Sequence, residues 1–464
     1  MESKRKSGAS LTAPLAGRRM HTSVDWASLP IDMVRLVTDR LLHSGDIVDY
    51  VAFRAVCSAW RASTPTPRER DPALRDPRLR PRDWIALCGG DSVPPDDTGE
   101  IELFHTRTAR RVCVRVPDLR DHRIVGFSQG LLVLVHKATA EIRVLHPFTC
   151  VAVDFPSLAP VYSEAIKYTN SFLQMNAAVC SAASSSSSIA VVLCVPYMHY
   201  VLAAEAGSDH WDILHRKLDV SNTLVFQGRL YGTTIMASRW EIVQLYPTTR
   251  SPQTLDLPVT VARAPSIPVP HHIFLVESRG QMLLVARAHH YFAFTVENIS
   301  AYRPTEWWKD KRFTMYEVNL NNNGDAKLSP VSCLLDRALF LSDYGCLSVS
   351  AIDLPSLVGN SIYFSVSRYP VLMHSLTTGL SEELAVECQI HDGDVRIRPS
   401  VRPFTIIDHL LTFCHPNEWT KGLMFHEYHE IPTSFKELLE KISAKWWEYK
   451  FRPSQAVHMG RETS

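Results

Sequence analysis

The feature that most constrains this chain is a long succession of short β-type runs between residue 84 and about residue 425. Runs such as residues 131–136 and 190–195 are apolar and β-branched, and turn residues bound them on both sides. Long stretches of helical periodicity are scarce in this part of the sequence. The pattern therefore predicts an all-β domain, and the many strand edges of such a domain favour a closed architecture.

A repeat inside this region indicates which closed architecture it is. Both copies contain Q-G, then E-I-x-x-L-x-P-x-T, then D-x-P. The first copy occupies residues 129–130, 141–149 and 154–156, and the second occupies residues 227–228, 241–249 and 256–258. Because Glu141 and Glu241 are 100 residues apart, the copies should not be adjacent repeats; weaker echoes begin at Gly280 and Gly345. Units of about 40–50 residues over about 340 predict a β-propeller of roughly six to eight blades in residues 84–430.

Residues 24–62 show helical periodicity instead, which predicts two or three short helices. Leu36 and Val37 belong to a first helical stripe, His43-Ser44-Gly45 interrupts it, and Asp46 is placed to cap the next helix. A module of about 40 residues buries too little surface to be stable alone. We therefore expect its apolar side chains to pack against another body.

The remaining segments are two tails, a linker and a terminal helix. Residues 1–23 and 451–464 are predicted to be disordered tails, the first of them basic. Residues 63–83 form a Pro/Arg-rich linker; interleaved acids and a lack of aromatics favour a solvated connector over a nucleic-acid-binding segment. Residues 431–450 form an amphipathic helix that begins at the capping box of Ser434 and Glu437. We expect it to dock on the β-domain; a partner's groove is the alternative.

Composition excludes several functional classes. With 49 basic and 48 acidic residues the net charge is +1, so no nucleic-acid partner is expected. The longest apolar run, residues 189–198, is about half of the roughly 20 residues that a membrane span needs, so no membrane association is expected. Ten cysteines without a C-x-x-C pair predict free thiols and no metal site. The expected location is the nucleus, the cytoplasm or both.

Three motifs suggest an enzyme, but none has the context that its chemistry requires. Residues 126–130 match G-x-S-x-G, yet a strand-like run follows where a nucleophile elbow needs a helix, so Ser128 should lie at a hairpin turn. Residues 426–429 (H-E-Y-H) are one residue too short for H-E-x-x-H. The pairs His271-His272 and His289-His290 have no further ligand at metal-binding spacing. We therefore predict no catalytic residue, no metal and no cofactor.

The N-terminal motifs, taken in order, resemble an F-box: L-P-x-D at residues 29–32, the Asp46 cap, and V-C-x-x-W-R at residues 56–61. The β-region resembles the plant family in which an F-box precedes a KIB-type β-propeller. The resemblance extends over about residues 25–430 and rests on the G-x-L-x-V turns and on residues 145–149, 275–280, 336–341 and 361–364. His146 departs from this pattern, because the family more often has Asn there.

The resemblance implies a mainly β protein with a small all-α F-box, a propeller and a C-terminal helix. It implies a non-catalytic adaptor of an SCF-type cullin-RING ubiquitin ligase, in which the F-box binds a Skp-family subunit and the propeller binds a client protein. Carried onto this chain, the Skp-binding residues are Leu29, Pro30, Val34, Val37, Leu41, Val56, Cys57 and Trp60. The alternative is a non-catalytic propeller that binds a ligand or protein outside any ligase.

Overall fold

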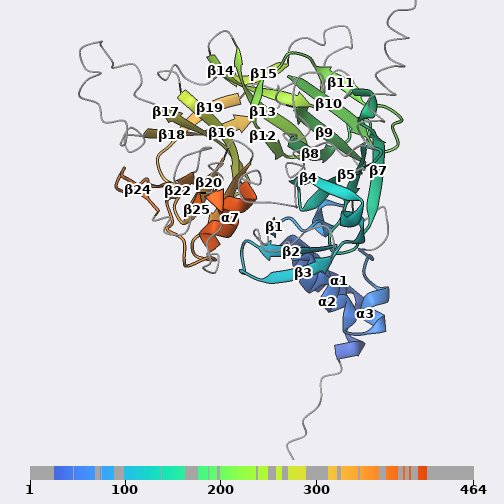
Figure 1. The fold of residues 1–464 in the computed structure, drawn as a ribbon. Coiled ribbons are helices and arrows are strands. Elements are labelled where there is room, and N and C mark those ends of the chain that lie inside the picture. Colours follow the sequence, from blue (N-terminus) through green and yellow to red (C-terminus); the bar gives the residue numbers. More distant parts are fainter. Residues whose placement is uncertain are drawn as a thin grey trace, which may run out of the picture.

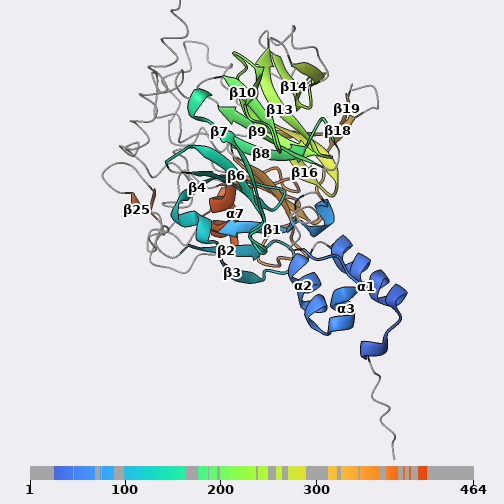
Figure 2. The ribbon, with the colours of Figure 1, turned by 90° about the vertical axis from the view of Figure 1, so that its right-hand side faces the viewer.

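The computed structural model has two parts, an N-terminal helical module and a ring of β-sheets (Figures 1 and 2). It describes residues 26–44, 46–67, 74, 76–87, 99–136, 138–161, 176–185, 188–195, 199–236, 239–248, 258–263, 270–288, 312–320, 326–342, 345–364, 372–384, 390–391, 397–398 and 406–414. The predicted tails and the terminal helix at 431–450 lie outside these residues.

The helical module contains the short helix η1 (Trp26–Ser28) and the helices α1 (Ile31–Ser44), α2 (Ile47–Ala55) and α3 (Ser58–Ala62). The predicted cap is present, because the Asp46 side chain accepts hydrogen bonds from Val48 N at 2.9 Å and Asp49 N at 3.3 Å. The Cys57 sulfur caps α3 by accepting from Trp60 N. Local capping therefore fixes where the second and third helices begin.

The β-region is a six-bladed propeller, which confirms the predicted fold at the lower end of the expected blade number. Blades 2 to 5 each have four antiparallel strands in chain order, blade 1 has three described strands, and blade 6 has five. The strands of blades 1 to 3 are β1 (Trp84–Leu87), β2 (Glu100–His105), β3 (Arg111–Arg115); β4 (His122–Ser128), β5 (Leu131–His136), β6 (Glu141–Leu145), β7 (Ala152–Ser157); β8 (Asn176–Ser181), β9 (Ile189–Val195), β10 (Tyr200–Glu205) and β11 (Asp212–His215).

Blade 4 contains β12 (Val220–Phe226), β13 (Arg229–Met236), β14 (Arg239–Tyr246) and β15 (Val259–Arg263), and blade 5 contains β16 (Pro270–Ser278), β17 (Gln281–Ala288), β18 (Arg312–Leu320) and β19 (Ala326–Val331). Blade 6 contains β20 (Arg337–Leu341), β21 (Cys346–Ser350), β22 (Ser361–Phe364), β23 (Leu372–Ser375) and β24 (Ser381–Glu383). Here β20 pairs with β22 in parallel, and β21 lies at the edge of the sheet. A two-stranded sheet pairs β25 (Ile390–His391) with β26 (Ile397–Arg398).

The repeated Q-G dipeptides form the same turn in two blades. Gln129 and Gly130 connect β4 to β5 with φ of 54° and 76°, and the second copy connects β12 to β13 with φ of 50° and 77°. Two consecutive residues with positive φ are typical of the tight turns that match the twist of a hairpin. The copies thus belong to blades 2 and 4, which are not adjacent, as the separation of 100 residues predicted. Arg279-Gly280 forms the corresponding turn in blade 5.

The ring is closed by a helix that the sequence analysis did not predict. Helix α7 (Ile406–Cys414) lies between the last and the first blade (Figure 1). Its buried residue Leu410 packs in one cluster with Ile85 of blade 1 and Phe340 of blade 6. The rings of Phe413 and Phe127 in blade 2 have centroids 5.9 Å apart. The expectation that this region contains only strands was therefore wrong at residues 406–414.

The linker differs from the predicted solvated connector. Among its described residues, Leu74, Leu79 and Arg80 are buried. The two leucines fill apolar clusters, and the Arg80 guanidinium donates from Nε and Nη2 to Leu74 O at 3.0 and 2.6 Å. These three residues therefore pack into the fold and do not lie in water.

Candidate partner-binding surface

The helical module carries an unusually apolar surface. Of twelve large hydrophobic side chains that are exposed in the described residues, seven belong to this small module. They extend from helix η1 through α1 and α2 to the residue after α2. We call them the apolar face: Trp26, Ile31, Met33, Leu36, Val37, Val51 and Val56. So many exposed apolar side chains in so small a module are expected where a partner covers it.

The orientation of α1 about its own axis decides which of its side chains are buried and which are exposed to a partner. Val34, Thr38 and Leu42 are spaced four residues apart, share one side of the helix, and are buried. Met33, Leu36 and Val37 lie on other positions of the helix and stay exposed. Both sides of α1 are apolar, so the sequence alone could not show which side faces inward.

The structure divides the predicted contact residues into three groups. Val56 is 61% exposed, and Pro30 and Val37 are also exposed. Leu29, Leu41 and Cys57 are half-buried. Two others lie inside the module, since Val34 is 2% exposed and the buried ring of Trp60 stacks on Phe53 with centroids 4.4 Å apart.

Val34 and Trp60 are therefore placed to hold the module together, and any effect of theirs on a partner is indirect in this conformation. Five members of the apolar face were missed as contact residues: Trp26, Ile31, Met33, Leu36 and Val51. For Met33 and Leu36 the signal in the sequence was the apolar spacing that they share with Val37 on α1.

Polar contacts keep the module in one arrangement. Arg54 of α2 donates from Nη1 to Thr64 Oγ1 and to Pro65 O, both at 2.6 Å, and the Tyr50 hydroxyl donates to Pro65 O. Burial raises the pKa of the Tyr50 hydroxyl, so it stays a neutral donor. These bonds tie α2 to the segment that follows α3, and the apolar face rests on a fixed scaffold.

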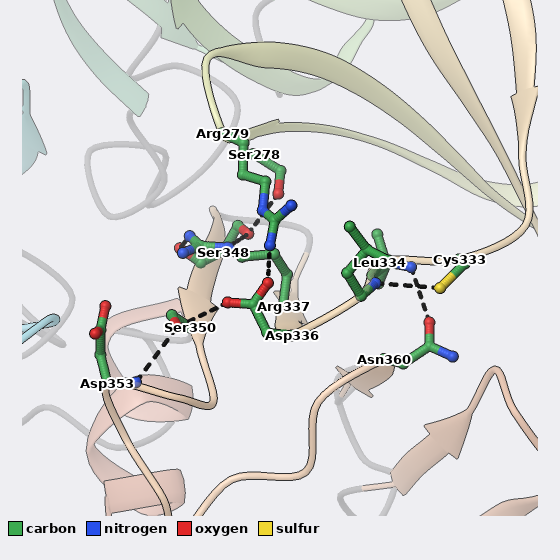
Figure 3. A network of polar contacts seen from close by, with 11 residues as sticks. Ser278, Arg279, Cys333, Leu334, Asp336, Arg337, Ser348, Ser350, Asp353 and Asn360 are labelled. Atoms are coloured by element: carbon green, nitrogen blue, oxygen red, sulfur yellow. Dashed lines mark hydrogen bonds and ion pairs between the residues drawn. The ribbon is translucent and has the colours of Figure 1, made fainter.

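A second exposed apolar group lies on blade 6. Leu335, Ile352 and Val358 are exposed on the loops around β20 and β21. Figure 3 shows a network of polar contacts that connects residues of the same loops and strands. In it Arg279 of blade 5 pairs with Asp336, which accepts a hydrogen bond from Ser350 Oγ at 2.9 Å.

Further bonds fix the same loops. Arg337 Nε donates to Ser348 Oγ at 3.0 Å, and the Ser348 hydroxyl lies 2.8 Å from that of Ser278 (Figure 3). Asn360 Oδ1 accepts from Leu334 N at 2.8 Å. Because Gly359 lies against the backbone of Leu335 and Asp336, where an added Cβ would be 3.3 Å from Leu335 O, the two loops interlock closely.

Among the motifs that suggested chemistry, Ser128 and His272 lie in the described residues and make contacts within the fold. Ser128 ends β4 at the predicted hairpin turn, and its hydroxyl accepts from Val179 N at 3.0 Å. His272 stacks on Phe274. Residues 289–290 and 426–429 lie outside the described part of the chain. Within the described residues no group of three or more His, Cys, Asp or Glu could hold a metal ion, and no helix there is long and apolar enough to cross a bilayer.

Comparison with known proteins identifies the β-region. Residues 103–394 match the KIB1-4 beta-propeller family. Two Arabidopsis thaliana proteins named as candidate F-box proteins are similar to shorter stretches. At5g60060 is 35% identical over 57 residues, and At1g65770 is 28% identical over 85 residues. These stretches cover 12% and 18% of this chain and 15% and 21% of the relatives' own lengths.

Among solved structures, a nidogen/laminin complex chain has a TM-score of 0.28 at 8% identity, with 65% of this chain and 91% of that chain covered.

Proposed function

Because the chain belongs to the KIB1-4 β-propeller family and carries a capped helical module before its propeller, we propose that it is the substrate-recognition adaptor of an SCF-type cullin-RING ubiquitin ligase. The helical module binds a Skp-family subunit, and the propeller binds a client protein. The chain itself performs no chemistry. It raises the effective concentration of a client lysine near the charged ubiquitin carrier.

The observation that carries this proposal is the apolar face. A separate subunit that covers Trp26, Leu36 and Val56 removes their apolar surface from water, which favours association by about 25 cal/mol per Å². Two F-box-named relatives support the same assignment. Buried apolar anchors of this kind can each contribute about 2 kcal/mol or more to binding. Pro30, Val37 and Val56 are the predicted residues that are best placed for direct contact.

The test compares two leucines of equal exposure. Leu36 on α1 and Leu380 in blade 6 are both 64% exposed, so Leu36→Asp and Leu380→Asp make the same chemical change without opening the core. We expect Leu36→Asp to abolish pull-down of a purified Skp-family subunit and Leu380→Asp to leave it intact. A further variant combines Leu29→Asp with Pro30→Ala and should behave like Leu36→Asp. Undiminished binding by Leu36→Asp would reject the proposal.

The client is expected to contact the exposed end of blade 6. Leu335, Ile352 and Val358 are presented there on loops that the Asp336 network holds in place. Loops on a rigid scaffold are the usual carriers of recognition. Affinity purification with Leu36→Asp should trap undegraded client. The same purification with Ile352→Asp added tests whether the client binds at blade 6, because the second substitution should then reduce the amount of trapped client.

We place the adaptor in the nucleus, the cytoplasm or both.

The alternative, a propeller that binds a small ligand near its axis, receives less support. Asn222 of blade 4 contacts two other blades, because its Oδ1 accepts from Leu275 N of blade 5 at 2.9 Å and its Nδ2 lies 3.6 Å from Cys346 Sγ of blade 6. These contacts engage one acceptor position and one donor of a buried amide, so fewer of its polar groups are left to face a ligand.

A further inference from the structure

We infer that the helical module and the propeller form one mechanical unit, with residues 76–84 as a partly buried joint that His146 and Arg110 hold in register. The contacts of this joint are independent of any partner. Its consequence for ubiquitin transfer rests on the proposed function, whereas the coupling itself does not.

An apolar core runs without interruption from one part to the other. Leu79 of the linker is buried with Leu42, Ile47 and Tyr50 of the helical module. Val48 of α2 and Phe148 of blade 2 pack against this cluster and also against the neighbouring cluster around Trp84 and Leu132 in blades 1 and 2. Side chains of the module and of two blades therefore share contacts, which a flexible tether would not provide.

His146 fastens the linker to blade 2. The imidazole is buried, and its Nε2 donates to Leu79 O at 3.0 Å. Leu79 is the residue that enters the core of the helical module, so one hydrogen bond joins blade 2 to the residue on which the module rests. Burial lowers the pKa of His146 to about 4, which keeps the ring neutral.

Gly130 fixes the linker from a second side. Its turn approaches the linker so closely that an added Cβ would lie 2.2 Å from Pro81 O. Blade 1 completes the enclosure, because Thr106 N donates to Asp83 O at 2.8 Å. The linker backbone is thus in contact with blade 1 and with two different turns of blade 2.

Arg110 bridges the module and blade 1 directly. It follows β2, and its Nη1 lies 3.2 Å from Asp46 Oδ2 and 2.9 Å from Asp49 Oδ1. Asp46 is also the cap of α2, and its side chain is nearly buried. One guanidinium therefore links the start of α2 to blade 1 of the propeller.

If the proposed function holds, a rigid joint has a direct consequence for client selection. The client surface of the propeller then stands at a fixed distance and angle from the Skp-binding helices. Only lysines inside a limited zone would reach the ubiquitin carrier. His146 and Arg110 are positioning residues in this scheme, since neither belongs to the apolar face or to blade 6.

Hydrogen exchange of the purified full chain tests the joint. Several linker amides are hydrogen-bonded, including Leu79 N to Asp76 O and Trp84 N to Pro81 O, so their exchange is measurable. We expect His146→Ala to accelerate exchange of residues 79–84 and of α2 together, by about tenfold or more, while β9 is unchanged. His122→Ala is the matched control, because His122 is also buried in blade 2 and bonds Asp118 O at 3.0 Å.

Arg110→Ala is the second variant, which leaves the buried core intact and should accelerate exchange in the first turn of α2 by severalfold. The inference is overturned if α2 keeps its exchange rate in both variants, or if His146→Ala and His122→Ala behave alike. Capture of a Skp-family subunit should persist in both variants. If the unaltered chain fails to capture that subunit, the proposed function is wrong. The exchange measurements would still show whether the helical module and the propeller are coupled.

Discussion

Truncation of one side chain in α7 tests how the propeller is closed. Leu410 is 0% exposed and packs between Ile85 of blade 1 and Phe340 of blade 6. Leu410→Ala removes three carbon atoms, a loss of about 2–3 kcal/mol at about 0.8 kcal/mol per buried methylene. The cavity that remains raises the expected loss to about 3–5 kcal/mol. Domains are typically stabilised by about 5–15 kcal/mol, so a loss of this size in the free energy of unfolding is easily measured.

Urea unfolding followed by tryptophan fluorescence gives the overall change in the free energy of unfolding. Hydrogen exchange locates it, since opening at α7 should accelerate β1–β3 and β20–β24 while blades 3 and 4 change less. Leu380→Ala is the control, because this exposed leucine lies in blade 6, against which α7 packs, and should change stability by no more than about 0.5 kcal/mol. Equal effects of the two variants would show that α7 does not close the ring.

Three further outcomes follow from single residues. Burial holds the pKa of His146 at about 4, below the unfolded value near 6.5. The unfolded state therefore binds the proton first, and the free energy of unfolding should fall as pH drops from about 6.5 to 4. His146→Asn should flatten this pH dependence in urea titrations. An unchanged pH dependence would show that other groups cause it. Gly228→Ala should lower the melting temperature, because φ is +77° and the new Cβ would lie 2.5 Å from Ser181 Oγ; an unaltered melting temperature would contradict the tight turn. Tyr246→Phe should accelerate exchange at Ala183 N, which donates to the Tyr246 hydroxyl at 2.8 Å, and equal exchange would show that Glu205, which accepts from the same amide, suffices.

The sequence predicted those parts of the fold that rest on local chemistry. The hairpin turn at residues 126–130 and the cap at Asp46 depend on residues that are close in sequence, so both could be predicted, and the structure contains both. The separation of the two repeat copies predicted correctly that they are not adjacent in the ring.

What the sequence did not predict depends on contacts between distant residues. The linker resembled a solvated chain because Arg80 is charged, and only the fold supplies Leu74 O as its acceptor. The residues of α7 are apolar at short spacing, which a strand could also satisfy. For the candidate site, both stripes of α1 are apolar, and the choice between Val34 and Leu36 required knowing where the second helix packs.

Hydroxyl-radical footprinting with a purified Skp-family subunit tests the central claim most directly. Trp26, Met33 and Leu36 are exposed in the isolated chain, and Ile352 and Leu380 on blade 6 serve as internal references of similar exposure. The account predicts that the added subunit strongly reduces labelling of the first three and leaves the two references unchanged. Unchanged labelling of Trp26, Met33 and Leu36 at saturating subunit would contradict it.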